Sequence, residues 1–261
     1  MADRGLEGIQ FKEIDRERKV HRKKHYFLRF LAVAAVAAAV YFFLRSSYFS
    51  VKHFEVEGNS YYTDKEVLAM AKVSEGENII FDTKLSELED NLLKDPYFRE
   101  VEAHRKLPST IKFTITERTQ TAAVKYGDSY IVMDEDGTVL RRTDIMPEIT
   151  LLTGLTISKM NVGEKLEAEE ATSLSVTLRM LDAMREGDIY FKKIDVSKVM
   201  IRCYIYDTFL VKGTPTEILA AIRSGELQKV VATLFAQDIS RGTIKMGGSD
   251  YMSFSPDIDS D

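Results

Sequence analysis

The sequence feature that most constrains this chain is the apolar stretch from Tyr26 to Leu44. Its nineteen residues carry one charge, Arg29, close to the start. As a helix rising about 1.5 Å per residue, the stretch would be roughly 28 Å long, which matches the hydrocarbon thickness of a bilayer. A buried helix of a folded domain would show a polar face, and from Phe30 to Leu44 the only polar side-chain group is the Tyr41 hydroxyl. The stretch therefore predicts a transmembrane helix.

A cleaved signal peptide is the alternative interpretation of an apolar stretch near an N-terminus. Such a peptide has a shorter segment before its apolar part and ends in small residues. Here twenty-five residues precede the stretch, and large side chains from Tyr41 to Arg45 close it. We therefore expect an uncleaved membrane anchor over residues 26–44.

The distribution of charge predicts how the anchor is oriented. The first 44 residues contain nine Lys and Arg against five Asp and Glu, a net charge of +4. Lys and Arg are retained on the cytoplasmic side of a membrane helix, so we expect residues 1–25 to form a cytoplasmic tail. The rest of the chain has 27 basic and 36 acidic side chains, a net charge of −9, and is expected outside the cytoplasm.

The acidity of the larger part also limits its partners. An acidic surface does not suit a nucleic acid, whose phosphates need clustered Lys and Arg. The basic cluster from Arg16 to Lys24 lies beside the predicted anchor, where attraction to anionic membrane lipid explains it. Cys203 is the only cysteine, which excludes an internal disulfide and a site built from several thiolates. These features favour a bacterial envelope protein.

The part after the anchor begins with a pattern typical of a small α+β domain. Apolar residues alternate as in strands or recur at helical spacing, with turn residues between the segments. The predicted order is strand, helix, helix, strand, strand. These elements are a strand within 49–57, a helix capped by Thr63 and Glu66, a helix over 85–93 ended by Asp95-Pro96, and strands at 98–106 and 110–117.

The remaining residues predict a mixed β-sheet domain with two helices. Short alternating runs are separated by strong hairpin signals such as Gly127-Asp128 and Asp136-Gly137. The predicted strands lie at 122–126, 130–134, 138–142, 149–153, 194–196, 200–206, 209–212, 242–246 and 250–254, and the helices at 167–185 and 214–236. The fold class is therefore α+β.

The first domain contains five short motifs: Phe54-Glu-Val-Glu-Gly-Asn59, Glu77-Asn-Ile-Ile-Phe81, Asp95-Pro-Tyr-Phe98, Arg105-Lys-Leu-Pro-Ser-Thr110 and Ile115-Thr-Glu-Arg118. Together they resemble the POTRA module of the FtsQ/DivIB family of bacterial cell-division proteins. A weaker resemblance, in layout and spacing, links Ile194–Val196, Val211–Gly213 and Gly242–Pro256 to the β domain of that family.

The resemblance implies both a layout and a function. The layout is a cytoplasmic tail (1–25), a transmembrane helix (26–44), a POTRA domain (49–117), a β domain (118–254) and a short acidic tail (255–261). The implied function is a non-enzymatic scaffold at the division septum that binds FtsL-like and FtsB/DivIC-like proteins and helps to regulate septal peptidoglycan synthesis. The alternative is a membrane-tethered envelope assembly or chaperone module that acts by adding strands to the POTRA sheet.

One motif, Ser109-Thr-Ile-Lys112, fits the Ser-x-x-Lys of penicillin-binding enzymes. Those enzymes place it at the start of a helix and add Ser-Asp-Asn and Lys-Thr-Gly. Here it falls at the start of a predicted strand, and the sequence contains neither companion motif. We therefore expect a turn followed by a strand, and no enzyme activity.

The sequence also predicts no metal, cofactor or small-molecule substrate. His53 and His104 lie in strands that could pair, but no third ligand has a motif spacing. Asp134, Glu135 and Asp136 resemble the start of a calcium loop, yet the glycine comes two places early and the last ligand position is Ile145. A hairpin turn explains the three acidic residues better. Walker and dinucleotide-binding glycine patterns are missing from the sequence.

The best candidate for a binding site is the last predicted strand, with residues Tyr251, Met252, Ser253 and Phe254. A terminal strand at the edge of a sheet exposes backbone groups that an incoming strand can pair with. The family resemblance implies that this strand receives a segment of the FtsB/DivIC-like partner. The open alternative is that Tyr251 and Phe254 only cover their own sheet.

Overall fold

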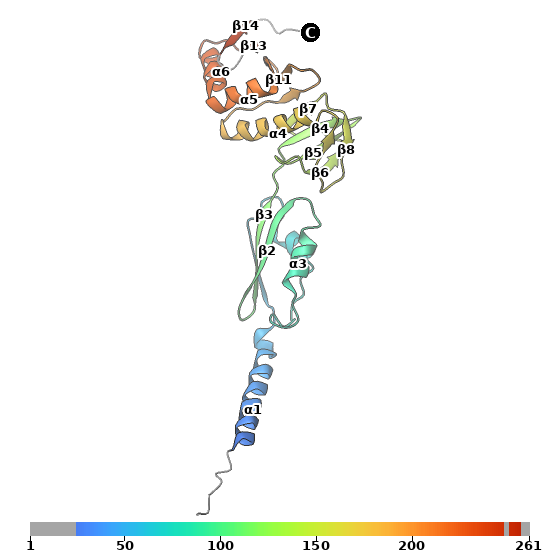
Figure 1. Cartoon of the computed structure of the whole chain (residues 1–261), viewed down its shortest axis with the longest axis vertical. Helices are drawn as coiled ribbons and strands as arrows, with labels where there is room; N and C mark the ends of the chain where they lie inside the picture. The colour runs from blue at the N-terminus through green and yellow to red at the C-terminus, as the bar shows by residue number, and fades with distance from the viewer. Residues whose placement is uncertain (1–24, 248–250, 257–261) are drawn as a thin grey trace, which may run out of the picture. The chain divides into compact units, whose positions relative to one another are not determined.

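The computed structural model describes residues 25–247 and 251–256 (Figure 1). It has a helix over the predicted apolar stretch, α1 (Tyr26–Leu44). Within the described residues this is the one helix long and apolar enough to cross a membrane. The predicted cytoplasmic tail, except for His25, lies outside the described residues, as do residues 257–261 of the predicted acidic tail. The chain divides after Ser46, and the folded unit that follows starts at Ser47.

The first domain of the folded unit has the predicted order of elements. A short 3-10 turn, η1 (Ser47–Phe49), precedes β1 (His53–Glu57), α2 (Asp64–Ala71), α3 (Leu85–Leu92), β2 (Phe98–Lys106) and β3 (Thr110–Glu117). The sheet order is β1-β3-β2, with β3 parallel to β1 and antiparallel to β2. The strand predicted from residue 49 begins at His53, because Phe49 closes the 3-10 turn and is buried.

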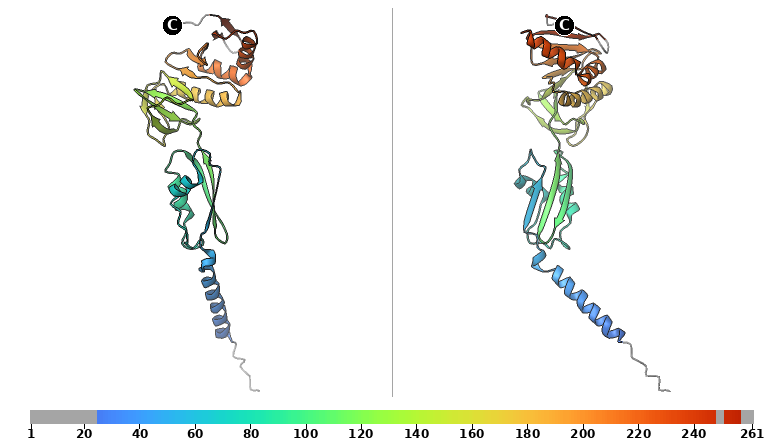
Figure 2. Two further views of the ribbon diagram at one scale, coloured as in Figure 1. Left: turned by 180° about the vertical axis from the view of Figure 1, so that it is seen from behind. Right: turned by 90° about the vertical axis from the view of Figure 1, so that its left-hand side faces the viewer.

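The two helices pack on one face of this three-stranded sheet (Figure 2). The inward residues Ile111, Phe113 and Ile115 of β3 are buried, as are Val67 of α2 and Leu92 of α3. Helix α2 starts at a capping box, in which the Thr63 hydroxyl accepts from Glu66 N–H and the Glu66 carboxylate accepts from Thr63 N–H. The spacing of Thr63 and Glu66 in the sequence therefore sets the start of α2.

The second domain is built on a nine-stranded mixed sheet in the order β14-β13-β12-β11-β10-β7-β4-β5-β6. The strands are β4 (Ala122–Tyr126), β5 (Ser129–Met133), β6 (Val139–Thr143), β7 (Thr150–Thr153), β10 (Lys193–Asp195), β11 (Ile201–Ile205), β12 (Phe209–Gly213), β13 (Gly242–Met246) and β14 (Met252–Ser255). A separate small pair, β8 (Ile157–Lys159) and β9 (Glu167–Ala168), was not predicted. Its short strands carry too little alternation to be recognised in the sequence.

Three helices belong to this domain, where the sequence predicted two. They are α4 (Ala171–Glu186), α5 (Pro215–Ser224) and α6 (Glu226–Ala236), and α4 and α5 lie side by side in Figure 1. The predicted helix over 214–236 is divided at Gly225, which has a left-handed φ of 73° and therefore ends α5. The helix predicted from residue 167 begins at Ala171, because residues 167–168 form β9. Apart from these two differences and the added β8–β9 pair, the structure confirms the α+β class and the predicted order of strands and helices.

Candidate interaction site at the C-terminal edge and the domain junction

Strand β14 forms one end of the nine-stranded sheet, where the sequence placed the binding residues. It pairs antiparallel with β13, with Met252 opposite Met246 and Phe254 opposite Ile244. In the part of the chain that the structure describes, β13 is its sole neighbour in the sheet. The predicted residues therefore lie at an open edge.

The register shows which backbone groups of β14 face outward. Gly247 N–H donates to Tyr251 C=O over 2.8 Å, so these two residues form a hydrogen-bonded pair. Hydrogen-bonded and non-hydrogen-bonded pairs alternate along an antiparallel ladder. Met252 and Phe254 consequently occupy non-hydrogen-bonded pairs, and their N–H and C=O groups point away from β13. These groups can pair with an incoming strand.

The side chains of the four predicted residues fall into two groups. Met252 and Phe254 are half-buried and pack against the core of the domain, where the Phe254 ring lies 6.4 Å from that of Phe209. Phe254 also covers Gly242, because a Cβ there would come within 2.5 Å of the ring. Tyr251 is 65% exposed. Phe254 thus covers its own sheet, whereas Tyr251 is accessible to a partner.

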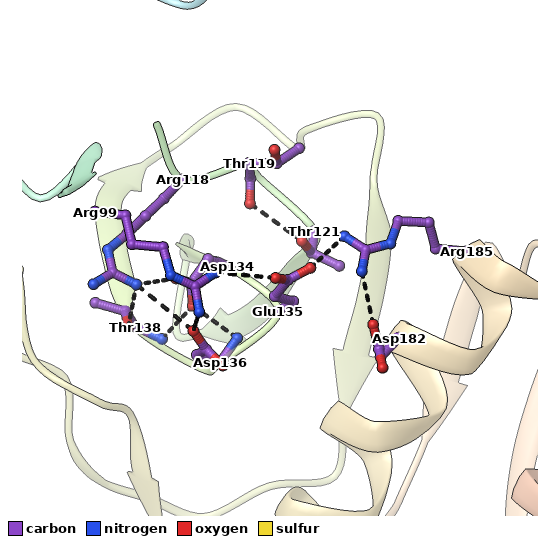
Figure 3. Close-up of polar contacts among 10 residues, drawn as sticks. All are labelled: Arg99, Arg118, Thr119, Thr121, Asp134, Glu135, Asp136, Thr138, Asp182 and Arg185. Atoms are coloured by element: carbon purple, nitrogen blue, oxygen red, sulfur yellow. Dashed lines mark hydrogen bonds and ion pairs between the residues drawn. The ribbon is translucent and has the colours of Figure 1, made fainter. Parts of the chain in front are cut away.

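A second feature, not found from the sequence, is a charged cluster where the first domain meets the second (Figure 3). We call it the junction cluster, and it comprises Arg99, Arg118, Asp134, Glu135, Asp136, Thr138, Asp182 and Arg185. The Arg118 guanidinium, in the linker after β3, donates to the Asp134 carboxylate over 2.6 Å. Asp134 is 1% exposed, yet its other oxygen accepts from the N–H groups of Asp136 and Thr138 at 3.0 and 2.7 Å. The buried carboxylate is therefore fully paired.

The remaining members of the junction cluster connect the two domains from the surface. Arg99 of β2 donates to Glu135 over 3.2 Å and lies 2.9 Å from an oxygen of Asp136. These carboxylates, Asp136 first, raise the pKa of the Arg99 guanidinium. Glu135 also accepts from Arg185 of α4, so one carboxylate joins an arginine from each domain. The acidic turn resembling a calcium loop is thus a hairpin turn whose charges pair with arginines.

The end of β3 is fixed by a second carboxylate, Glu117. Its two oxygens accept from three successive N–H groups, those of Ser60 and Tyr61 at 2.7 and 2.6 Å and that of Tyr62 at 3.3 Å. The loop that donates them starts at Gly58, which has a φ of 90° and approaches the backbone of β3 so closely that a Cβ would lie 2.0 Å from a carbonyl oxygen. Only glycine fits there. An open cavity of about 520 Å³ adjoins this loop.

The candidate catalytic and metal residues are not assembled into sites. Lys112 lies 2.8 Å from Glu57, whose carboxylate raises the lysine pKa, the opposite of what a general base requires. The expectation that the strands of His53 and His104 could pair is wrong, since β3 lies between β1 and β2. Among the described residues, groups of three His, Cys, Asp or Glu placed to hold a metal are not found. Cys203 is buried, which raises the pKa of its thiol.

Comparison with known proteins identifies the first domain. The family described as "POTRA domain, FtsQ-type" matches residues 49–118, which run from the 3-10 turn through β3. The folded unit is therefore that of a POTRA-containing protein. A solved structure of the major extracytoplasmic domain of DivIB from Geobacillus stearothermophilus covers 42% of this chain and 96% of its own, at 14% identity and a TM-score of 0.26, too low to carry a structural argument.

Curated relatives extend the match beyond the POTRA domain. Cell division protein DivIB of Clostridium acetobutylicum is 25% identical over 178 residues, 67% of this chain and 71% of that protein. DivIB of Clostridium botulinum strain Hall is 22% identical over 205 residues, 77% and 80% of the two chains. FtsQ of Novosphingobium aromaticivorans is 27% identical over 121 residues, 46% and 36%. Residues 49–118 are thus an FtsQ-type POTRA domain, and the similarity to cell-division proteins named DivIB and FtsQ extends beyond that domain.

Proposed function

We propose that the chain is a non-enzymatic scaffold of the cell-division machinery, anchored in the cell membrane at the septum. Its first 25 residues lie in the cytoplasm and its two folded domains outside. Support comes from the apolar helix α1, the net charge of +4 over residues 1–44, the FtsQ-type POTRA domain and the names of the relatives. The scaffold holds FtsL-like and FtsB/DivIC-like partners and thereby helps to regulate septal peptidoglycan synthesis.

The observation that carries this proposal is the open edge at β14. An incoming segment of the FtsB/DivIC-like partner adds a tenth strand, pairing with the outward N–H and C=O groups of Met252 and Phe254. Tyr251, which is exposed, supplies an aromatic contact to the added strand. Backbone pairing gives the affinity, and the side chains give the specificity.

A pair of substitutions at Met252 tests the strand addition. Met252→Pro removes the outward N–H without removing a hydrogen bond to β13, and proline is tolerated on edge strands. Met252→Ala keeps that N–H but removes the same side chain. With the full-length protein and its FtsB/DivIC-like partner, we expect the proline variant to bind about tenfold more weakly than the alanine variant. Surface-immobilised partner and biolayer interferometry measure the ratio.

The control is Ser253→Pro, because Ser253 occupies a hydrogen-bonded pair with Lys245. Proline there removes a bond within the sheet, so we expect a lower melting temperature as well as weaker binding. Equal partner affinity of Met252→Pro and Met252→Ala, with both variants folded, would contradict strand addition at β14.

The alternative function, an envelope assembly module, has one observation in its favour. Strand β2 is an edge of the POTRA sheet and is nine residues long, so it offers a second place for strand addition. Binding of peptides of unrelated sequence at β2, with β14 substitutions without effect, would favour this alternative.

A further inference from the structure

The connection between the apolar helix and the POTRA domain is very short. Helix α1 ends at Leu44, and η1 begins at Ser47. Phe49, the last residue of η1, is 7% exposed and so is fixed in the folded domain. Arg45 and Ser46 can span at most about 7 Å. If α1 crosses a membrane, as the proposed function requires, the end of the POTRA domain that contains Phe49 must lie at the membrane surface.

Three segments of the POTRA domain meet at this end. The loop at residues 76–79 and the turn at residues 107–109 are both joined to residues 49–53 by backbone hydrogen bonds. The donor and acceptor pairs are Gly76 to Val51 (3.0 Å), Val51 to Glu77 (2.9 Å), Ile79 to Phe49 (2.9 Å), Lys52 to Ser109 (2.9 Å) and His53 to Ser109 (3.2 Å). In addition, the Arg105 guanidinium donates to the carbonyls of Ile79 and Thr83. The three segments therefore form one continuous surface.

Large apolar side chains are exposed on this surface. Leu107, at the tip of the turn between β2 and β3, is 57% exposed, as is Tyr48, and Phe81 is 44% exposed. Tyrosine is enriched at membrane–water interfaces, and Leu and Phe are among the apolar residues that interfacial helices bury in the headgroup region. We define Tyr48, Phe81 and Leu107 as the base surface.

Charges of both signs surround the base surface. Lys52 and Lys106 are exposed, and Lys106 lies 2.9 Å from Glu55. Glu75 and Glu77, on the neighbouring loop, are exposed as well. Because these charges largely offset each other, any attraction of this surface to lipid would come mainly from insertion of the apolar side chains. It would therefore be expected on zwitterionic as well as on anionic lipid.

We propose that the base surface inserts into the headgroup layer of the phospholipid bilayer that α1 crosses. Lipid is the occupant because the two-residue connection keeps it within reach of the base surface at all times, which gives it a very high effective concentration. Insertion of Leu107 and Tyr48 adds a second attachment beside α1. The POTRA domain is thereby held against the membrane and does not turn freely on its connection.

Depth-dependent fluorescence quenching tests this in the full-length protein. Leu107→Cys and, as the matched control, Thr116→Cys carry the same fluorophore in nanodiscs that contain brominated phosphatidylcholine. Cys203 is buried and stays unlabelled. Thr116 lies six residues from Thr110 along β3, roughly 20 Å further from the base surface. We expect quenching about threefold stronger at position 107 than at 116. Equal quenching at the two positions overturns the proposal.

A second pair of variants tests whether the Leu107 side chain itself holds the base surface on the lipid, or whether the short connection to α1 alone brings the domain close to it. With the fluorophore at Ser74→Cys, an exposed position on the adjoining loop, Leu107→Glu should reduce quenching by about half. Leu93→Glu, at a leucine of 46% exposure after α3, should leave the signal unchanged. If Leu107→Glu also has no effect, the side chain does not hold the domain on the lipid.

The outcome is independent of the proposed partner binding, since the nanodiscs contain no partner. A third fluorophore position, Ala34→Cys in the middle of α1, reports on the anchor itself. Strong quenching there with none at 107 would refute the base surface alone. The absence of quenching at both positions would refute the anchor and, with it, the proposed function.

Discussion

The polar groups of the junction cluster are paired within the chain, whereas backbone groups at the C-terminal edge point outward. At the junction, the Asp134 carboxylate has donors from Arg118 and two backbone N–H groups, and Glu135 has an arginine from each domain. At the edge, the N–H and C=O groups of Met252 and Phe254 point away from the sheet. The junction is closed within the chain, whereas the edge is left open to another one. The outward groups of Met252 and Phe254 are therefore the ones that we propose a partner pairs with.

The largest effect on stability is expected for a substitution in the junction cluster. Asp134→Ala leaves the Arg118 guanidinium and two backbone N–H groups without their acceptor in a buried place. We predict a loss of about 3 kcal/mol in the free energy of unfolding. Asp128→Ala, at the exposed turn between β4 and β5, should change stability by less than about 0.5 kcal/mol. Urea unfolding followed by circular dichroism compares the two; a similar small effect of both would show that the junction does not depend on Asp134.

At the β14 edge, the two aromatic residues are expected to differ in their effects on stability and on partner binding. Phe254→Ala removes a half-buried ring that packs on Phe209 and over Gly242, so we predict a loss of about 2 kcal/mol in stability. Tyr251→Ala removes an exposed ring and should cost less than about 0.5 kcal/mol, while weakening partner binding. Thermal melting and titration with the partner give both quantities. If Tyr251→Ala lowers the melting temperature as much as Phe254→Ala, the assignment of Tyr251 to the partner is wrong.

The smallest effect should come from the exposed ion pairs of the junction cluster. The Arg99 side chain is 40% exposed, so Arg99→Ala should cost no more than about 1 kcal/mol. Since salt screens such pairs, the difference from the unmodified chain should shrink in about 0.5 M NaCl. Unfolding curves at low and high salt test this. A cost that persists at high salt would mean that packing of the arginine stem, and not charge, is what is lost.

The elements fixed by local signals could be predicted from the sequence. Thr63 and Glu66 predict the start of α2, Thr214-Pro215-Thr216 predicts the start of α5, and the hairpin signals at Gly127-Asp128 and Asp136-Gly137 lie at turns of the structure. In each case the residues that determine the structure are within a few positions of each other. The predicted place of β14 at a sheet edge also holds, because it follows from a terminal strand next to a hairpin.

The features that depend on distant residues could not be predicted. Arg99 and Glu135 are 36 positions apart, and no spacing rule connects them. The break at Gly225 was missed because the apolar pattern continues through it and a helix tolerates an interior glycine at a cost of about 1 kcal/mol. The different burial of Tyr251 and Phe254 depends on Phe209 and Gly242, which the chain brings to the edge only when the sheet is complete.

The connection between β12 and β13 has a consequence for the proposed docking edge. These strands are parallel neighbours, and the chain between them is occupied by α5 and α6. Among the described residues β14 pairs with β13 alone, so its place at the edge depends on the pairing of β13 with β12 across this crossover. Under the proposed function, a chain in which the crossover is disrupted would offer no edge to a neighbour.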